Sequence, residues 1–196
     1  SDTAVGLRRF IGPKKRPEHI YTGGSREFEK ACEIEGWEGV HDTSRPYRPA
    51  TNGVADRAVR KVTEGSSCTL VQSGFSGLFW REAMVLFCFL SNIIHVQASH
   101  GMTAYEARFG VSFEGPVVPC GAHVMYKPSS EADMKRLPKI GTGLLPGIFF
   151  GYVQKCGGQW TGDVIVCDWE QIEQAEHAPD PRRVSMKEIV VVKSDG

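Results

Sequence analysis

The sequence predicts an α/β protein whose first part is largely helical and whose last part is a small β-barrel. Two segments, 52–72 and 78–97, carry apolar residues at helical spacing. After Gly110, glycine and proline recur and several short β-rich segments follow one another. Short strands separated by turn signals are typical of a small barrel. We therefore predict two domains, at 1–115 and 116–196.

Short elements are predicted before the first long helix. Residues 1–19 show no self-contained hydrophobic pattern. Residues 19–22 and 37–41 have the composition of short strands. Between them, Ser25 is a suitable N-cap for a helix that reaches about Gly36.

The later elements follow from caps and breakers. Gly65 predicts an interruption of the first long helix, because glycine in a helix interior costs about 1 kcal/mol relative to alanine. Thr103 and Glu106 form a capping box that begins a third, short helix. The predicted strands of the barrel are 122–126, 147–153, 163–168 and 188–193.

Charge and composition limit the function classes. The chain has 196 residues, 41% of them hydrophobic, and its 23 Lys and Arg balance 23 Asp and Glu. A neutral chain is not a polybasic nucleic-acid binder, so any DNA contact must come from a local patch. The apolar run 79–96 includes Arg81 and Glu82, which predicts a buried core helix and no membrane span.

The six cysteines are scattered, without a Cys-x-x-Cys pair. This spacing predicts neither a structural zinc site nor a disulfide framework. Because several cysteines lie inside apolar runs, we expect a reducing, intracellular setting; no N-terminal signal peptide is visible.

The segment 41–60 carries the clearest chemical signal. Its two prolines force the residues before them into extended conformations, so Tyr47 and Arg48 lie in a loop. Asn52 is a natural N-cap for the helix that follows, and Asp56 then faces the loop from inside that helix. A carboxylate beside a basic, aromatic-bearing loop is an arrangement suited to a phosphodiester.

Basic residues surround this carboxylate. Between residues 42 and 61, five Arg and Lys stand against two Asp, a local excess of three positive charges. Each cation could contact a phosphate, or belong to an ordinary solvated face. Tyr47 could stack on a splayed base or pack on the loop prolines. The predicted nucleic-acid-binding residues are Arg45, Tyr47, Arg48, Asn52, Arg57, Arg60 and Lys61.

Three motifs, in order along the chain, resemble a known family. Residues 46–57 resemble the Pro-Tyr-x-Pro-x-x-Asn-Gly-x-Ala-Glu-Arg motif of retrotransposon integrases, with Asp56 at the position of the catalytic Glu. Residues 101–110 are similar to the Thr-Pro-Tyr-Glu-x-x-x-Gly segment that follows the core in Copia-type polyproteins. Residues 121–126 and 147–152 are similar to a motif pair of the SH3-like barrel after that core.

The resemblance implies an RNase H-like integrase core, N-terminally truncated, followed by a small SH3-like β-barrel. The implied activity is DNA integration, in which 3′-hydroxyls of element cDNA attack target-DNA phosphates with magnesium as cofactor. It also implies DNA as partner, a homo-oligomer and a nuclear location. A truncated sheet leaves an unpaired edge and exposed apolar surface, so we predict poor solubility or dependence on the missing segment.

The family's metal ligands are two Asp and one Glu, and this chain departs from that set. Asp56 aligns with the Glu, which predicts it as the catalytic and metal-binding residue. The second Asp aligns with Gly23, in a segment similar to Ser-Asp-Asn-Gly-Gly-Glu-Phe, and the first is expected outside the chain. An Asp carboxylate lies about 1.5 Å closer to the backbone than a Glu carboxylate, and a misplacement of that size can cost on the order of 100-fold in rate. We therefore predict that this copy is catalytically degenerate.

Three functions stay open from the sequence. The chain could be a degenerate integrase fragment, a domesticated non-catalytic DNA-binding module, or a protein-interaction module. Asp56 could instead be a surface acid paired with Arg60 at i,i+4. Glu27 and Glu29 are weaker candidates for substitute ligands, because a carboxylate in the first turn of a helix is already favoured by the helix dipole.

Overall fold

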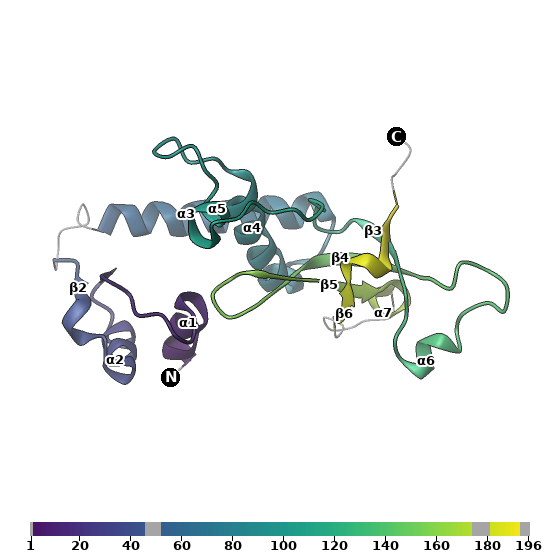
Figure 1. Cartoon of the computed structure of the whole chain (residues 1–196), viewed down its shortest axis with the longest axis horizontal. Helices are drawn as coiled ribbons and strands as arrows, with labels where there is room; N and C mark the ends of the chain where they lie inside the picture. The colour runs from purple at the N-terminus through teal and green to yellow at the C-terminus, as the bar shows by residue number, and fades with distance from the viewer. Residues whose placement is uncertain (1, 46–51, 174–180, 193–196) are drawn as a thin grey trace. The chain divides into compact units, whose positions relative to one another are not determined.

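The computed structural model describes three stretches of the chain: residues 2–45, 52–173 and 181–192. The chain divides into two compact units, and Figure 1 labels most of their elements. The first unit comprises residues 1–62 with 154–159, and the second comprises 63–153 with 160–196. The domain boundary predicted at 115/116 stays a prediction.

The first unit begins with α1 (Asp2–Ile11), although no helix was predicted in residues 1–19. The guanidinium of Arg8 lies 4.7 Å from the centroid of the Trp37 ring and pairs with the carboxylate of Glu35. Ala4, Leu7 and Ile11 also lie at helical spacing, with Ala4 buried. The statement that residues 1–19 have no hydrophobic pattern was therefore wrong, because it overlooked this spacing.

A small parallel sheet follows α1. Its strands are β1 (Ile20–Thr22) and β2 (His41–Thr43), joined through α2 (Arg26–Glu35). The first strand and the helix confirm the predictions. The second strand begins only at His41, because a 3₁₀ turn at Glu38–Val40 occupies most of the segment predicted as strand.

The long helix α3 (Gly53–Ser73) is a single helix without the interruption predicted at Gly65. A Cβ atom built on Gly65 would lie 2.1 Å from Cζ of Phe87, a residue of α4 (Trp80–Ile94). The absence of a side chain at this position therefore allows the aromatic ring to approach the backbone of α3. The glycine marks a close helix contact, and the predicted interruption was wrong.

The helix α4 is apolar but not fully covered. With the 3₁₀ turn before it, Gly77–Ile94 is the one stretch among the described residues long and apolar enough to cross a membrane by length and composition. Only 17% of this stretch is buried, and Trp80 is 57% exposed. Core helices of soluble proteins pass the same test, so it is weak evidence for a span. The predicted absence of a membrane partner stays a prediction.

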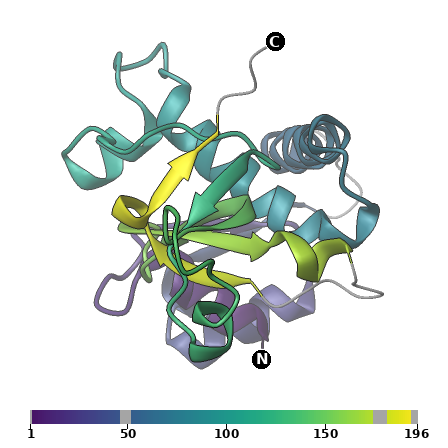
Figure 2. The ribbon, with the colours of Figure 1, turned by 90° about the vertical axis from the view of Figure 1, so that its right-hand side faces the viewer.

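A five-stranded antiparallel sheet forms the centre of the second unit, and Figure 2 shows its strands. The sheet order is β6-β5-β4-β3-β7, so β3 pairs with both β4 and the last strand. Four of the strands overlap predicted ones, whereas β6 was not predicted. The strands are β3 (His123–Tyr126), β4 (Leu145–Gln154), β5 (Trp160–Asp168), β6 (Arg182–Ser185) and β7 (Ile189–Val191).

One apolar core joins this sheet to two helices. Phe149 of β4 is completely buried, and it clusters with Phe89 of α4 and Tyr105 of α5 (Ala104–Phe109). Aromatic rings of the helices meet those of the sheet, as in the Phe89–Tyr152 pair, whose centroids are 4.6 Å apart. The predicted capping box of α5 is confirmed, with both of its reciprocal hydrogen bonds present.

Candidate nucleic-acid interface

The site begins where β1 ends. Gly23 directly follows Thr22, the last residue of that strand. A Cβ atom built on Gly23 would lie 3.4 Å from Nδ2 of Asn52, at the start of α3. The fold therefore brings together two positions that the sequence keeps far apart.

Asn52 links this glycine to the predicted catalytic residue. Its Nδ2 donates a 2.9 Å hydrogen bond to Oδ1 of Asp56, one turn further along α3. Its Oδ1 is buried and accepts no hydrogen bond from the described residues. A buried acceptor without a donor is costly, by about 1–3 kcal/mol, so its presence beside Gly23 distinguishes this spot from an ordinary helix start.

The space in front of Gly23 would accept a side chain. Its nearest neighbour would lie at 3.4 Å, the lower end of ordinary van der Waals contact, and its φ lies outside the left-handed region. Neither sterics nor backbone conformation therefore requires glycine here. Position 23 therefore lacks a carboxylate although the site has room for one.

The residues present do not fit a magnesium ion. Magnesium prefers six oxygen ligands in near-octahedral geometry, and the group of Gly23, Asn52 and Asp56 offers a single carboxylate. Among the described residues, no group of three or more His, Cys, Asp or Glu side chains is placed to hold a metal. The six cysteines, all described, are free thiols.

The predicted cations on α3 lie at its exposed beginning. Arg57, Arg60 and Lys61 are all exposed, and their spacing of three and four residues puts them on neighbouring positions of one helix surface. Nε of Arg57 donates a 3.1 Å hydrogen bond to the carbonyl of Gly53. Arg45 is exposed just after β2. The predicted Tyr47 and Arg48 lie outside the described residues.

The histidines near the small sheet were not predicted to interact. Nε2 of His41 lies 2.8 Å from Oγ1 of Thr22, and Nε2 of His19 lies 2.8 Å from Oδ2 of Asp42. Both contacts link the β1 segment to the β2 segment. The parallel register explains them, because it sets Ile20 opposite His41. No spacing along the sequence could have indicated this pairing.

Charge is distributed unevenly between the two units. The residues of the first unit include 13 Lys and Arg against nine Asp and Glu, a formal charge of +4. Those of the second unit include ten against 14, a formal charge of −4. The neutral total therefore conceals a basic first unit, which contains all the predicted nucleic-acid-binding residues.

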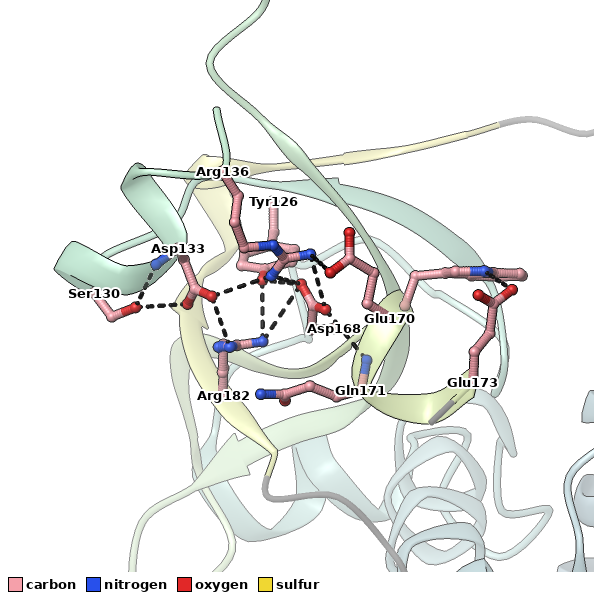
Figure 3. A network of polar contacts seen from close by, with 10 residues as sticks. Tyr126, Ser130, Asp133, Arg136, Asp168, Glu170, Gln171, Glu173 and Arg182 are labelled. Carbon is pink, nitrogen blue, oxygen red and sulfur yellow. Dashed lines mark hydrogen bonds and ion pairs between the residues drawn. The ribbon is translucent and has the colours of Figure 1, made fainter. Parts of the chain in front are cut away.

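A second polar cluster was missed by the sequence analysis. Figure 3 shows Tyr126, Asp133, Arg136, Asp168 and Arg182 converging in the second unit. Asp168 is completely buried and accepts hydrogen bonds from the Tyr126 hydroxyl at 2.7 Å and from both terminal nitrogens of Arg136, at 3.0 and 3.2 Å. The residues are scattered between positions 126 and 182, so only the fold brings them together.

The carboxylates of this cluster accept hydrogen bonds from other members of the cluster. Asp133 accepts hydrogen bonds from Ser130 at 2.7 Å and from Arg182 at 2.9 Å. Burial raises the pKa of Asp168, but hydrogen bonds from Arg136 and Tyr126 outweigh it and leave that pKa below its usual value. Because the buried carboxylates are already paired and hydrogen-bonded, the cluster is suited to holding the fold together.

The chain is similar to part of a retrotransposon polyprotein. The retrovirus-related Pol polyprotein from transposon TNT 1-94 of Nicotiana tabacum is 34% identical over 89 residues, which cover 44% of this chain. The matched part spans 7% of that polyprotein. The predicted resemblance to a retrotransposon polyprotein is thereby confirmed. No protein-family model matches the chain.

A solved structure is also similar, at low identity. It is a cryo-EM structure of a simian T-cell lymphotropic virus intasome in complex with PP2A regulatory subunit B56 gamma. The match has 17% identity and a TM-score of 0.42, and covers 100% of this chain and 65% of the other. A TM-score of this size is too low to establish a shared fold.

Proposed function

We propose that this chain is an integrase-like retrotransposon protein that binds DNA through its first unit and does not catalyse strand transfer. The grouping of Gly23, Asn52 and Asp56 carries the proposal. Two of these residues, Gly23 and Asp56, align with metal ligands of retrotransposon integrases. The fold places both beside Asn52, as expected for positions that once shared a site.

The same grouping argues against catalysis by this chain. Metal-dependent phosphodiester transfer needs clustered carboxylates that hold two divalent ions about 4 Å apart. Gly23 contributes no side-chain oxygen, and Oδ1 of Asp56 accepts a hydrogen bond from Asn52. Any magnesium bound here would be bound weakly, and the proposal assigns it no role.

DNA binding is supported by the charge of the first unit. Its formal charge of +4 and the exposed cations at the start of α3 can neutralise phosphates without reading sequence. The proposed binding residues are those predicted from the sequence, with Arg57, Arg60 and Lys61 on one helix surface. DNA binding also implies a nuclear location, and a homo-oligomer is the proposed working form.

The proposed architecture is an RNase H-like core followed by an SH3-like barrel. The parallel pair β1–β2 supports the first part. The second part is supported by the sheet, in which the last strand returns to pair with β3.

The test is a DNA-binding titration across a salt series. The chain and an Arg57→Ala, Arg60→Ala variant are titrated against a labelled duplex. We expect affinity to fall with salt, and the slope of log K against log salt to decrease by about 2 in the double variant, near one unit per lost phosphate contact. A Lys135→Ala, Lys139→Ala variant is the matched control, since both lysines are exposed in the second unit.

Two results would contradict the proposal. If both variants lost the same DNA affinity, binding would depend on the total charge of the chain and not on the cations of the first unit. No binding at low salt, in a sample with a cooperative unfolding transition, would favour the protein-interaction module instead.

A further inference from the structure

An exposed tryptophan of the second unit has no role in the candidate interface or in the buried polar cluster. Trp169 begins α7 (Trp169–Glu173), directly after β5, and it is 39% exposed. Its Nε1 donates a 2.6 Å hydrogen bond to Oε1 of Glu173, and the centroid of its ring lies 5.6 Å from that of His123. Two contacts therefore hold the exposed indole in place, which lowers the entropy lost when a partner binds it.

The face of the sheet beside His123 is apolar. In the register of β3 and β7, His123 lies opposite Val192, whose amide donates a 2.9 Å hydrogen bond to the His123 carbonyl. Met125 lies opposite Val190 on the same face, because side chains alternate along a strand. Val190 and Val192 are 56% and 39% exposed, and β7 is an edge of the described sheet. An exposed apolar strip thus extends from His123 to an edge at which a further strand can pair.

The charge around Trp169 is negative. Residues 156–181 include six Asp and Glu and no Lys or Arg. Figure 3 shows two of the acids, Glu170 and Glu173, on α7. Glu170 pairs with Arg136 at 2.9 Å, whereas no ion pair joins Glu173 to a cation among the described residues. The charge of Glu173 is thus available to a basic partner.

An exposed aromatic ring suits two classes of partner, and the charge distinguishes between them. Nucleic-acid bases stack on such rings, but their phosphates would be repelled by the carboxylates beside Trp169. An arginine or lysine side chain is attracted both by the face of the indole and by a carboxylate. The nearby Lys127 and Lys187 lie at the other end of β7, where Lys127 pairs with Glu188 at 3.7 Å. A basic peptide therefore fits this surface better than a nucleic acid.

We propose that Trp169, Glu173 and His123 form a binding site for an arginine or lysine side chain of an extended basic peptide in a partner protein. The cation lies over the exposed face of the indole, with the carboxylate of Glu173 beside it. The peptide runs along the edge strand β7. The formal charge of −4 on the second unit favours such a partner. This inference does not depend on the proposed DNA binding, which belongs to the first unit.

The test is a titration of the full chain into a fluorescein-labelled nonapeptide of alternating arginine and threonine, followed by fluorescence anisotropy. We expect Trp169→Ala to bind this peptide about tenfold more weakly, because the cation loses the indole face. Glu173→Gln keeps an acceptor for the indole N–H but removes the charge, and should bind about threefold more weakly. The same peptide with citrulline in place of arginine keeps the shape without the charge, and should bind the parent chain more weakly.

Two variants of the second unit are matched controls. Trp80→Ala removes another exposed tryptophan, which is 57% exposed on α4, and Glu131→Gln neutralises another exposed acid. Parental affinity in both controls, with the expected losses in Trp169→Ala and Glu173→Gln, supports the site. Equal weakening in Glu131→Gln and Glu173→Gln overturns it, because binding then follows general charge. No binding by the folded parent chain at peptide concentrations up to about 1 mM also overturns it.

Two further measurements on Trp169→Ala identify other occupants of the surface. If this variant sediments as a smaller species than the parent chain, the ring contacts a second copy and the proposal is wrong. If its DNA affinity falls in the salt titration, the ring stacks on a base and the proposal is equally wrong. Loss of peptide binding with unchanged DNA affinity supports the site, whether or not the first unit binds DNA.

Discussion

The hydroxyl of Tyr126 donates a 2.7 Å hydrogen bond to the carboxylate of Asp168, and this contact joins two strands that are not neighbours in the sheet. Tyr126 ends β3 and Asp168 ends β5, with β4 between them. Arg136 and Arg182 reach the same carboxylate at 3.0 and 3.5 Å (Figure 3). One buried acid therefore links three strands and the segment between β3 and β4.

Removing this acid should be severe. Asp168→Ala would leave two arginines and a tyrosine without their buried acceptor, and breaking such a buried pair costs about 3–5 kcal/mol. Asp163→Ala is the matched control, because its partner Arg183 is 62% exposed and exposed pairs contribute at most about 1 kcal/mol. Urea unfolding of both variants measures the difference. If both variants lost the same free energy of unfolding, the buried cluster would stabilise the fold no more than an exposed ion pair.

The pKa of Asp168 also predicts how stability depends on pH. Because its pKa is lowered in the folded protein, the acid stabilises the fold fully above its unfolded pKa of about 3.9, and this contribution is lost as pH falls through the folded pKa. The second unit should therefore lose stability below about pH 4. Asp168→Asn should show a shallower acid dependence in urea titrations at successive pH values. A variant curve parallel to the parental curve would exclude this acid as the cause.

Periodic elements could be predicted from the sequence, whereas contacts between distant segments could not. Strong local signals gave the α5 capping box and most strands of the sheet. The helix α1 was missed although Ala4, Leu7 and Ile11 lie at helical spacing, whereas its contact between Arg8 and Trp37 depends on the fold. At the candidate site, the motif around Asp56 was visible, but the burial of Asn52 Oδ1, which accepts no hydrogen bond from the described residues, depends on the fold.

Gly65 shows how a correct local rule can lead to a wrong structure. Glycine disfavours a helix interior, and on that basis an interruption was predicted. Packing against Phe87 decides otherwise, since its ring occupies the space of a side chain at this position. We expect the intrinsic penalty of glycine to be smaller than the loss that a side chain would cause.

The close contact with Phe87 predicts that Gly65→Ala lowers the free energy of unfolding. Better helix propensity would contribute about 1 kcal/mol, but a Cβ atom 2.1 Å from the Phe87 ring must displace it. Overpacking of this kind costs about 1–3 kcal/mol, so we expect net destabilisation in urea unfolding. Gly6→Ala in α1 is the control, because its Cβ would meet nothing within 4 Å, and it should stabilise. In Gly65→Ala combined with Phe87→Ala, the penalty at Gly65 should disappear, a coupling that a double-mutant cycle detects.

Gly23→Asp tests whether this position is a lost metal ligand. The variant should fold, because its Cβ has an ordinary 3.4 Å neighbour and the backbone is not left-handed. Its carboxylate would lie beside Asn52 and close to Asp56, providing a second acidic ligand. Magnesium should then raise the melting temperature of the variant and leave that of the parent unchanged. At a concentration of about ten times Kd, the stabilisation would be about 1.4 kcal/mol.

Gly24→Asp adds the same charge one residue later, where a Cβ would meet nothing within 4 Å, and should not respond to magnesium. If magnesium raised the melting temperature of both variants equally, the effect would be nonspecific ion binding by an added carboxylate. Activity needs more than this pair, because the integrases that the chain resembles use three acidic ligands. Gly23→Asp with Asp56→Glu, in a chain extended to include the first Asp, should therefore nick DNA in magnesium. Failure of that folded protein to nick DNA, despite binding magnesium, would mean that these positions form an ion site but not the lost catalytic centre.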